Sequence, residues 1–101
     1  MRYRFDLSVL ALEDLRAIAR FTQARWGATQ RNRYLKQIDR VFRSLASNPQ
    51  MGQACDDILE GYRKFPHGQH VIFYTLPGDD VLLIVRILHA AMDVDDAFAT
   101  A

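Results

Sequence analysis

Two nearly continuous apolar runs, separated by a short turn, constrain the fold more than any other feature of this chain. Residues 70–76 and 81–88 are hydrophobic at almost every position, and a Pro-Gly-Asp-Asp segment at residues 77–80 stands between them. This turn composition predicts a β-hairpin. Strands that are apolar on both sides usually belong to a sheet whose two faces are both covered. The hairpin therefore predicts a sheet that needs two covering layers.

The first half of the chain supplies one of these layers. Residues 3–7 alternate apolar and charged side chains, which predicts a short strand. Residues 9–26 and 28–46 repeat apolar side chains at three- and four-residue steps, as amphipathic helices do. Ser8 precedes the first helix as an N-cap, and Gly27 stands where a helix often ends in a residue with positive φ. The very short connection at Gly27 predicts an antiparallel pair of helices.

The predicted elements follow the order β-α-α-β-β-β. After the helices, strands are expected over residues 58–65, 70–76 and 81–89, and a short helical or extended tail over residues 93–98. The fold class is therefore α+β, a helical hairpin packed on a small antiparallel sheet, in one domain over residues 1–101. Two helices cover only one face of that sheet. The second face could be covered by a partner chain, a dimer mate or the tail. We favour a partner chain because large exposed apolar patches usually mark interfaces.

Composition excludes several classes of protein. The net charge of +1 gives no basic field for nucleic acid, and no apolar run approaches the ~20 residues of a membrane span. Cys55 is the only cysteine, which excludes an internal disulfide framework and a thiolate zinc site. The histidines lack a supporting cysteine or carboxylate pattern, so neither a metal nor another cofactor is expected. With no visible targeting segment, a reducing cytoplasm is the expected location.

Several short motifs occur in a specific order along residues 5–93. Each is weak by itself, and the information lies in their combined order and spacing. They are Leu7-Ser8, Asp14-Leu15, Trp26-Gly27, Asn48-Pro49 with Gly52, Gly61-Tyr62-Arg63, His70-Val71-Ile72-Phe73-Tyr74, Arg86-Ile87-Leu88-His89 and Met92-Asp93. In this arrangement the chain resembles the ParE branch of the RelE/ParE toxin superfamily.

The resemblance implies a toxin–antitoxin pair. It implies that the chain inhibits DNA gyrase by binding, without catalytic residues, and that a ParD-like antitoxin encoded beside it neutralises it. Antitoxins of this kind bind DNA with their N-terminal half and wrap the toxin with a C-terminal segment that folds on binding. The chain would then belong to a hetero-oligomer, would contact DNA only through the antitoxin, and would have no membrane partner.

Candidate residues for the antitoxin contact lie on the last predicted strand. Arg86 interrupts an apolar run, and burying an unpaired arginine is costly. Two interpretations stay open: a salt bridge within the chain, to Asp56, Asp57 or Glu60, or an anchor for an antitoxin carboxylate. Regular alternation along the strand would place four side chains on one face, which we predict to bind the antitoxin. They are Leu82, Ile84, Arg86 and Leu88.

The second predicted helix carries a row of basic side chains opposite its apolar side. This row, called the basic stripe below, consists of Arg33, Lys36, Arg40 and Arg43. Such a row is usually a solvated helix face. Its functional interpretation is a contact with acidic antitoxin residues, gyrase or DNA phosphates, and we predict that it binds the target together with the C-terminal tail. Trp26 is expected in the core, and Arg63 in a salt bridge.

A ribosome-dependent mRNA endonuclease, as in the RelE branch, is the alternative function. Cleavage through the 2′-hydroxyl needs a general base, a general acid and a cation that stabilises the phosphorane. The candidates are Arg63, Lys64, His67, His70, Arg86 and His89, of which His70 and Arg86 could converge from neighbouring strands. Phe98, the only aromatic in the tail, has no acid–base capacity, so binding is favoured over catalysis. A third hypothesis is a degenerate toxin, kept only to corepress its operon through the antitoxin.

Overall fold

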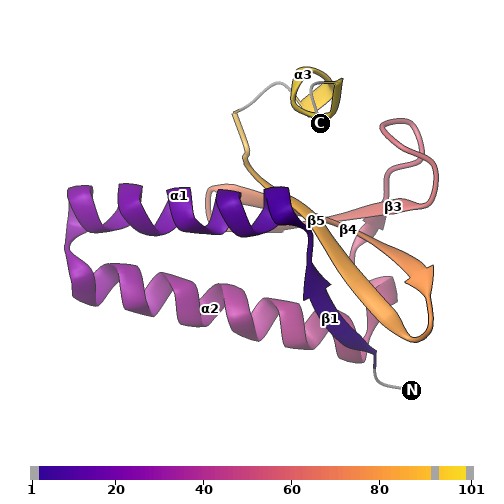
Figure 1. Cartoon of the computed structure of the whole chain (residues 1–101), viewed down its shortest axis with the longest axis horizontal. Helices are drawn as coiled ribbons and strands as arrows, with labels where there is room; N and C mark the ends of the chain where they lie inside the picture. The colour runs from indigo at the N-terminus through magenta and orange to yellow at the C-terminus, as the bar shows by residue number, and fades with distance from the viewer. Residues whose placement is uncertain (1–2, 92–93, 100–101) are drawn as a thin grey trace.

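The computed structural model describes residues 3–91 and 94–99, in which two long helices pack on a mixed sheet (Figure 1). The sheet has five strands in the order β1-β5-β4-β3-β2. Along the chain the elements are β1 (Arg4–Leu7), α1 (Val9–Trp26), α2 (Ala28–Ser47), a 3₁₀ turn (Pro49–Met51), β2 (Gln53–Ala54), β3 (Tyr62–His67), β4 (His70–Gly78), β5 (Val81–His89) and α3 (Val94–Ala99). The predicted α+β class and element order are confirmed, whereas β2 and the 3₁₀ turn were not predicted.

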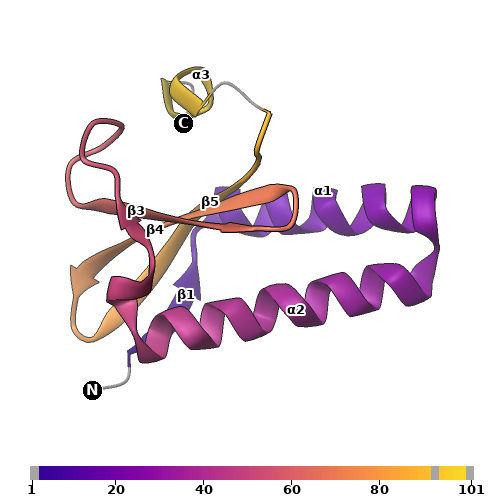
Figure 2. The same cartoon turned by 180° about the vertical axis from the view of Figure 1, so that it is seen from behind.

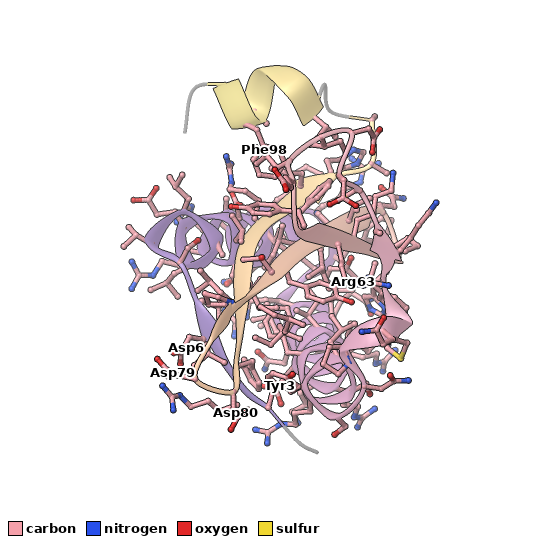
Figure 3. All side chains as sticks on the ribbon, turned by 90° about the vertical axis from the view of Figure 1, so that its right-hand side faces the viewer. Tyr3, Asp6, Arg63, Asp79, Asp80 and Phe98 are labelled. Carbon is pink, nitrogen blue, oxygen red and sulfur yellow. The ribbon has the colours of Figure 1, made fainter. Side chains whose placement is uncertain are left out.

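Strands β2 to β5 form the predicted antiparallel sheet, and β1 adds a parallel edge beside β5, with Phe5 opposite Leu82. The β4–β5 turn is formed as expected. Its two aspartates, at the end of the hairpin in Figure 3, have φ values of 56° at Asp79 and 57° at Asp80. Positive φ at two successive turn residues is the geometry that suits the right-handed twist of a hairpin.

The strand predicted over residues 58–65 begins later, at Tyr62. The preceding segment is a turn in which the Cys55 carbonyl accepts hydrogen bonds from the amides of Ile58 and Leu59. The amide of Gly61 donates to Asp56 Oδ1 (2.7 Å), and Gly61 has a φ of 80°. This left-handed conformation favours glycine, so Gly61 ends the turn and does not lie within the strand.

The helical hairpin has the predicted ends. Ser8 Oγ accepts a hydrogen bond from the amide of Ala11 (3.0 Å), and Gly27, with a φ of 95°, separates α1 from α2. Both helices continue past the sheet, so that their connecting end projects beyond it in front and rear views (Figure 2). No helix in the described part of the chain is long and apolar enough to cross a membrane.

The main core lies between the helical hairpin and the facing side of the sheet. Its buried side chains come from α1, α2, β4 and β5, with partly buried support from β1. Besides Ala11, they are Ile18, Ile38, Phe42, Leu45, Ile72, Tyr74, Leu82, Ile84 and Ile87. Burial of this apolar surface is the main favourable contribution to folding.

Tyr74 joins this core to the segment that follows α2. Its side chain is fully buried, and its hydroxyl donates to the Pro49 carbonyl (2.6 Å) and accepts from the Gly52 amide (2.9 Å). Burial raises the pKa of the Tyr74 phenol. A hydroxyl with both a donor and an acceptor partner can be buried without the penalty of an unsatisfied polar group.

The opposite face of the sheet is covered by the chain itself. Phe73 and Leu88 are buried there with Cys55, and the tail helix α3 packs over them. Phe98 points from α3 toward the sheet (Figure 3), with its ring centroid 5.1 Å from that of Phe73 and 6.1 Å from that of Tyr62. The expectation that a partner chain covers this face is therefore wrong. The predicted tail is helical from Val94, while Asp93 lies outside the described residues.

An irregularity in β5 overturns the predicted face of antitoxin-binding residues. Ile84 pairs with Tyr74 and Arg86 pairs with Phe73, which leaves Val85 as an extra residue between them. Such a β-bulge shifts the alternation of side chains by one position. As a result, Leu82 and Ile84 are fully buried in the main core with Ile87, whereas Leu88 belongs to the opposite cluster. The four predicted residues thus do not share one face.

Candidate partner-binding site

A groove of about 750 Å³ lies where the projecting helical hairpin passes the end of the sheet. The helices contribute Ile18, Phe21, Arg25, Trp26 and Tyr34, and the sheet end contributes His70, Leu88 and His89. A groove of this size, with apolar walls and a few polar groups, is typical of a ligand or peptide site.

Two aromatic side chains line this groove while remaining largely open to solvent. Phe21 is 66% exposed and Trp26 is 63% exposed, so the prediction that Trp26 belongs to the core is wrong. The reason is geometric, because the end of α1 extends past the sheet together with the start of α2. The Arg25 guanidinium lies 5.3 Å from the centre of the Trp26 ring. Large exposed aromatic groups next to a cation are typical anchors in protein interfaces.

Three histidines and one tyrosine form a cluster at the sheet end of the groove. The Tyr34 hydroxyl lies 2.7 Å from His70 Nδ1, and the Tyr34 ring stacks on His67 at 5.7 Å between centroids. His89 contacts the edge of His70 at 5.7 Å. Burial lowers the pKa of the His70 imidazole, and the nearby His89 and His67 lower it further. Among the described residues, no His, Cys, Asp and Glu side chains are grouped to hold a metal ion.

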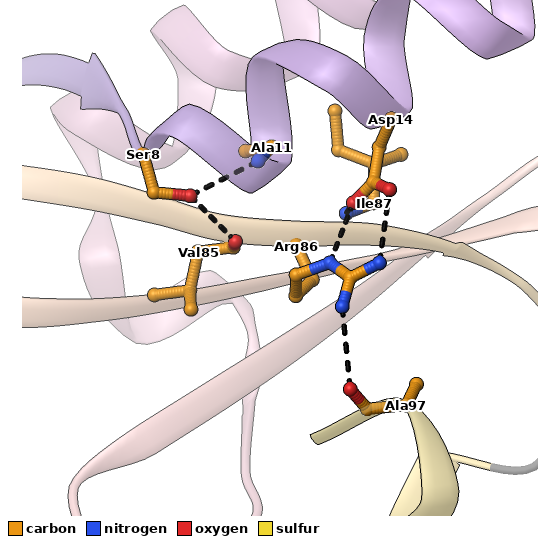
Figure 4. A network of polar contacts seen from close by, with 7 residues as sticks. All are labelled: Ser8, Ala11, Asp14, Val85, Arg86, Ile87 and Ala97. Carbon is orange, nitrogen blue, oxygen red and sulfur yellow. Dashed lines mark hydrogen bonds and ion pairs between the residues drawn. The ribbon is translucent and has the colours of Figure 1, made fainter. Parts of the chain in front are cut away.

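Arg86 forms a partly buried ion pair with Asp14 of α1 (Figure 4). Arg86 Nε and Nη2 donate to the two carboxylate oxygens at 2.8 and 3.0 Å, and the amide of Ile87 also donates to Asp14 (3.0 Å). Arg86 Nη1 donates to the Ala97 carbonyl at 3.3 Å, which ties the pair to α3. The hydrogen bond to Asp14 raises the pKa of the Arg86 guanidinium. This bidentate arrangement joins α1, β5 and α3.

The salt bridge predicted for Arg86 thus exists, but its partner is not Asp56, Asp57 or Glu60. A signal for Asp14 was present in the sequence. It lies one helical turn from Ala11 and one turn from Ile18, both buried, which places a carboxylate on the apolar side of α1. A charged group at such a position is expected to need a partner inside the fold.

Arg63 has a structural role, as expected, but its partners are backbone carbonyls and not a carboxylate. Its Nε donates to the Gly52 carbonyl (2.9 Å), and its Nη2 lies 3.4 Å from the Gln50 carbonyl. The two nuclease candidates that were expected to converge also have separate partners. His70 is bonded to Tyr34 and Arg86 to Asp14, so these two side chains do not converge on one site.

The basic stripe is exposed along α2, on the side away from the core residues of that helix. Arg43 forms an ion pair with Asp39 (2.8 Å) one turn earlier and lies 6.0 Å from the Phe5 ring. An exposed pair at this spacing contributes little to stability. The stripe is therefore available to solvent or to a partner, and the fold does not require its charges.

Comparisons with known proteins agree with this architecture. Residues 5–94 match the family described as ParE toxin of type II toxin-antitoxin system, parDE. Toxin ParE1 of Mycobacterium tuberculosis is 41% identical over 95 residues, which cover 94% of this chain and 97% of the relative.

Solved structures show the same fold. The chromosomal ParDE toxin–antitoxin system of P. aeruginosa superposes with a TM-score of 0.74 at 17% identity, covering 87% of this chain and 96% of the other. The RelBE2 toxin–antitoxin complex of Mycobacterium tuberculosis gives a TM-score of 0.64 at 18% identity, covering 88% of this chain and 99% of the other. The family match spans most of the chain, and its residues build a RelE/ParE fold, so this chain belongs to the ParE toxins of type II toxin–antitoxin systems.

Proposed function

We propose that this toxin acts by binding DNA gyrase in the cytoplasm and that a ParD-like antitoxin neutralises it by filling the groove. The observation that carries the antitoxin assignment is the pair of solvent-exposed aromatics, Phe21 and Trp26, at the wall of a preformed groove. Exposed apolar surface of this kind on a small chain usually marks a protein interface. The antitoxin and toxin would then form a hetero-oligomer that reaches DNA through the antitoxin.

The groove suits an amphipathic helix better than an extended strand. One wall is formed by α1 and α2, and the other by the end of the sheet. The apolar groups of the groove include Ile18, Phe21 and Trp26. A helix that presents apolar side chains at three- and four-residue steps would fill such a groove. Of the four residues first considered for this contact, Leu88 lines the groove and Arg86 holds Asp14 at its wall, whereas Leu82 and Ile84 support the core.

Groove substitutions provide a direct test of antitoxin binding. Replacing Phe21 and Trp26 together with serine is expected to weaken antitoxin affinity about 100-fold, because both anchors are lost. The fold should be retained, since both side chains are mostly exposed. Val9→Ser is the matched control, because Val9 is an apolar residue of the same helix that is 75% exposed and lies outside the groove. Equal antitoxin affinity in the two variants, measured by calorimetry, would exclude the groove.

Gyrase inhibition is tested with purified components. Gyrase incubated with the toxin and supercoiled plasmid should accumulate cleaved DNA, and prior addition of the antitoxin should prevent this. Replacing the four basic-stripe residues with glutamine should raise the toxin concentration required by about tenfold, because steering by surface charge is lost. Arg16→Gln with Arg20→Gln, on the exposed side of α1, is the control. Inert mixtures, or codon-positioned cuts on ribosomes, would contradict the proposal.

A further inference from the structure

The histidines at the sheet end of the groove have no free counter-ion among the described residues that line it. Asp14 is the only carboxylate in that lining, and its two oxygens accept from Arg86 and from the Ile87 amide. On the opposite wall, Arg25 adds a permanent positive charge. The groove is therefore apolar in its middle and able to carry positive charge at both sides.

We propose that the segment occupying this groove carries a carboxylate that docks against His70 and His89, so that complex formation is coupled to the uptake of a proton. This inference rests on the proposed antitoxin binding and specifies the chemistry of the partner. Its basis is charge complementarity, because a carboxylate pairs with an imidazolium, and the positive charge of Arg25 in the groove further favours an acidic segment.

The groups around His70 account for the coupling. Tyr34 of α2 supplies a hydroxyl at 2.7 Å from Nδ1, His67 of β3 and His89 of β5 supply two further imidazoles, and Asp14 of α1 is held by Arg86. In the free chain, burial and the two other histidines lower the pKa of His70, so that its neutral form predominates near pH 7. A partner carboxylate placed beside the ring favours the charged form.

The direction of the pH dependence follows from this difference. If the complex holds more protons than the free components, affinity rises as pH falls, by at most about tenfold per pH unit for each proton taken up. The rise ends when the pH drops below the pKa of His70 in the free chain, because His70 is then already protonated before binding. An apolar partner with no carboxylate gives the opposite trend, because burying an imidazolium without a counter-ion is unfavourable.

The test uses the whole toxin and the antitoxin encoded beside it. Isothermal titration calorimetry between about pH 6 and pH 8, in two buffers of different ionisation enthalpy, measures the protons taken up on binding. We expect close to one proton near neutral pH, and tighter binding toward pH 6. In His70→Asn the side-chain amide, which can both donate and accept, takes the place of Nδ1 as the hydrogen-bond partner of the Tyr34 hydroxyl. The fold should therefore be kept while most of the proton uptake is lost. His89→Gln should lose a smaller part of it.

The possible outcomes are distinct. Binding without proton uptake, or uptake that is unchanged in both histidine variants, overturns the inference and leaves the antitoxin proposal intact. Affinity that falls toward pH 6 overturns it as well, and points to an apolar occupant. The absence of any complex at all pH values rejects antitoxin binding itself, and this inference with it.

Discussion

Replacing Asp14 with alanine is expected to lower the free energy of unfolding by about 3 kcal/mol. The substitution leaves the guanidinium of Arg86, which is 15% exposed, without its bidentate partner, and it also removes the acceptor of the Ile87 amide. A charge that stays mostly buried after losing its partner carries a large desolvation penalty. Urea unfolding followed by circular dichroism measures the effect.

Two further variants isolate the ion pair. Glu13→Ala removes an exposed carboxylate at the neighbouring position of α1 and should change stability by less than about 0.5 kcal/mol. Asp14→Ala combined with Arg86→Met should be less destabilising than the sum of the two single changes, because no unpaired charge is left behind. If Asp14→Ala lowers the free energy of unfolding by less than about 1 kcal/mol, solvent takes the place of the ion pair, which contradicts the proposed role of Asp14.

Replacing Gly52 with alanine is expected to destabilise the fold by about 3 kcal/mol, through a steric conflict in the core. A Cβ at this position would lie 2.3 Å from the Tyr74 hydroxyl oxygen and 2.7 Å from Cε1 of the same ring. Gly52 has a φ of −80°, which any residue adopts, so backbone strain contributes nothing. Tyr74 is fully buried and would have to move, breaking its hydrogen bonds to Pro49 and Gly52.

Gly61 is the control for this steric effect, because its surroundings are open and its φ is positive. Gly61→Ala places a Cβ in open space but requires a φ of 80°, so it should cost only about 1 kcal/mol of conformational strain. Tyr74→Phe removes the nearest clashing atom, and Gly52→Ala should therefore be less damaging in that background. Thermal unfolding of the set separates the two causes, and equal losses in both glycine variants would argue against a clash with Tyr74.

The features predicted correctly from the sequence are those whose causes are local. The Ser8 cap, the end of α1 at Gly27 and the turn at residues 77–80 each depend on a few adjacent residues with strong conformational preferences. The element order followed from the change between helical and strand periodicity. The family's motifs pointed to the same fold.

The features that were missed depend on contacts between distant parts of the chain. The bulge at Val85 is stabilised by the N-cap of α1, because Ser8 Oγ donates to the Val85 carbonyl at 2.7 Å (Figure 4). No pattern within β5 predicts this contact. The Asp14–Arg86 pair likewise spans 72 positions. For Trp26 the periodicity gave the correct side of the helix, but it could not tell that the sheet ends before reaching that side chain.

The cover that α3 places on the sheet has a consequence for the toxin when no partner is bound. Because Phe98 shields Phe73 within the same polypeptide, loss of an antitoxin bound in the proposed groove would expose the projecting end of the helices and leave this cluster covered. The free toxin then keeps both of its hydrophobic clusters intact. It need not unfold or aggregate when no partner is present. On the proposed function, release would leave a folded molecule.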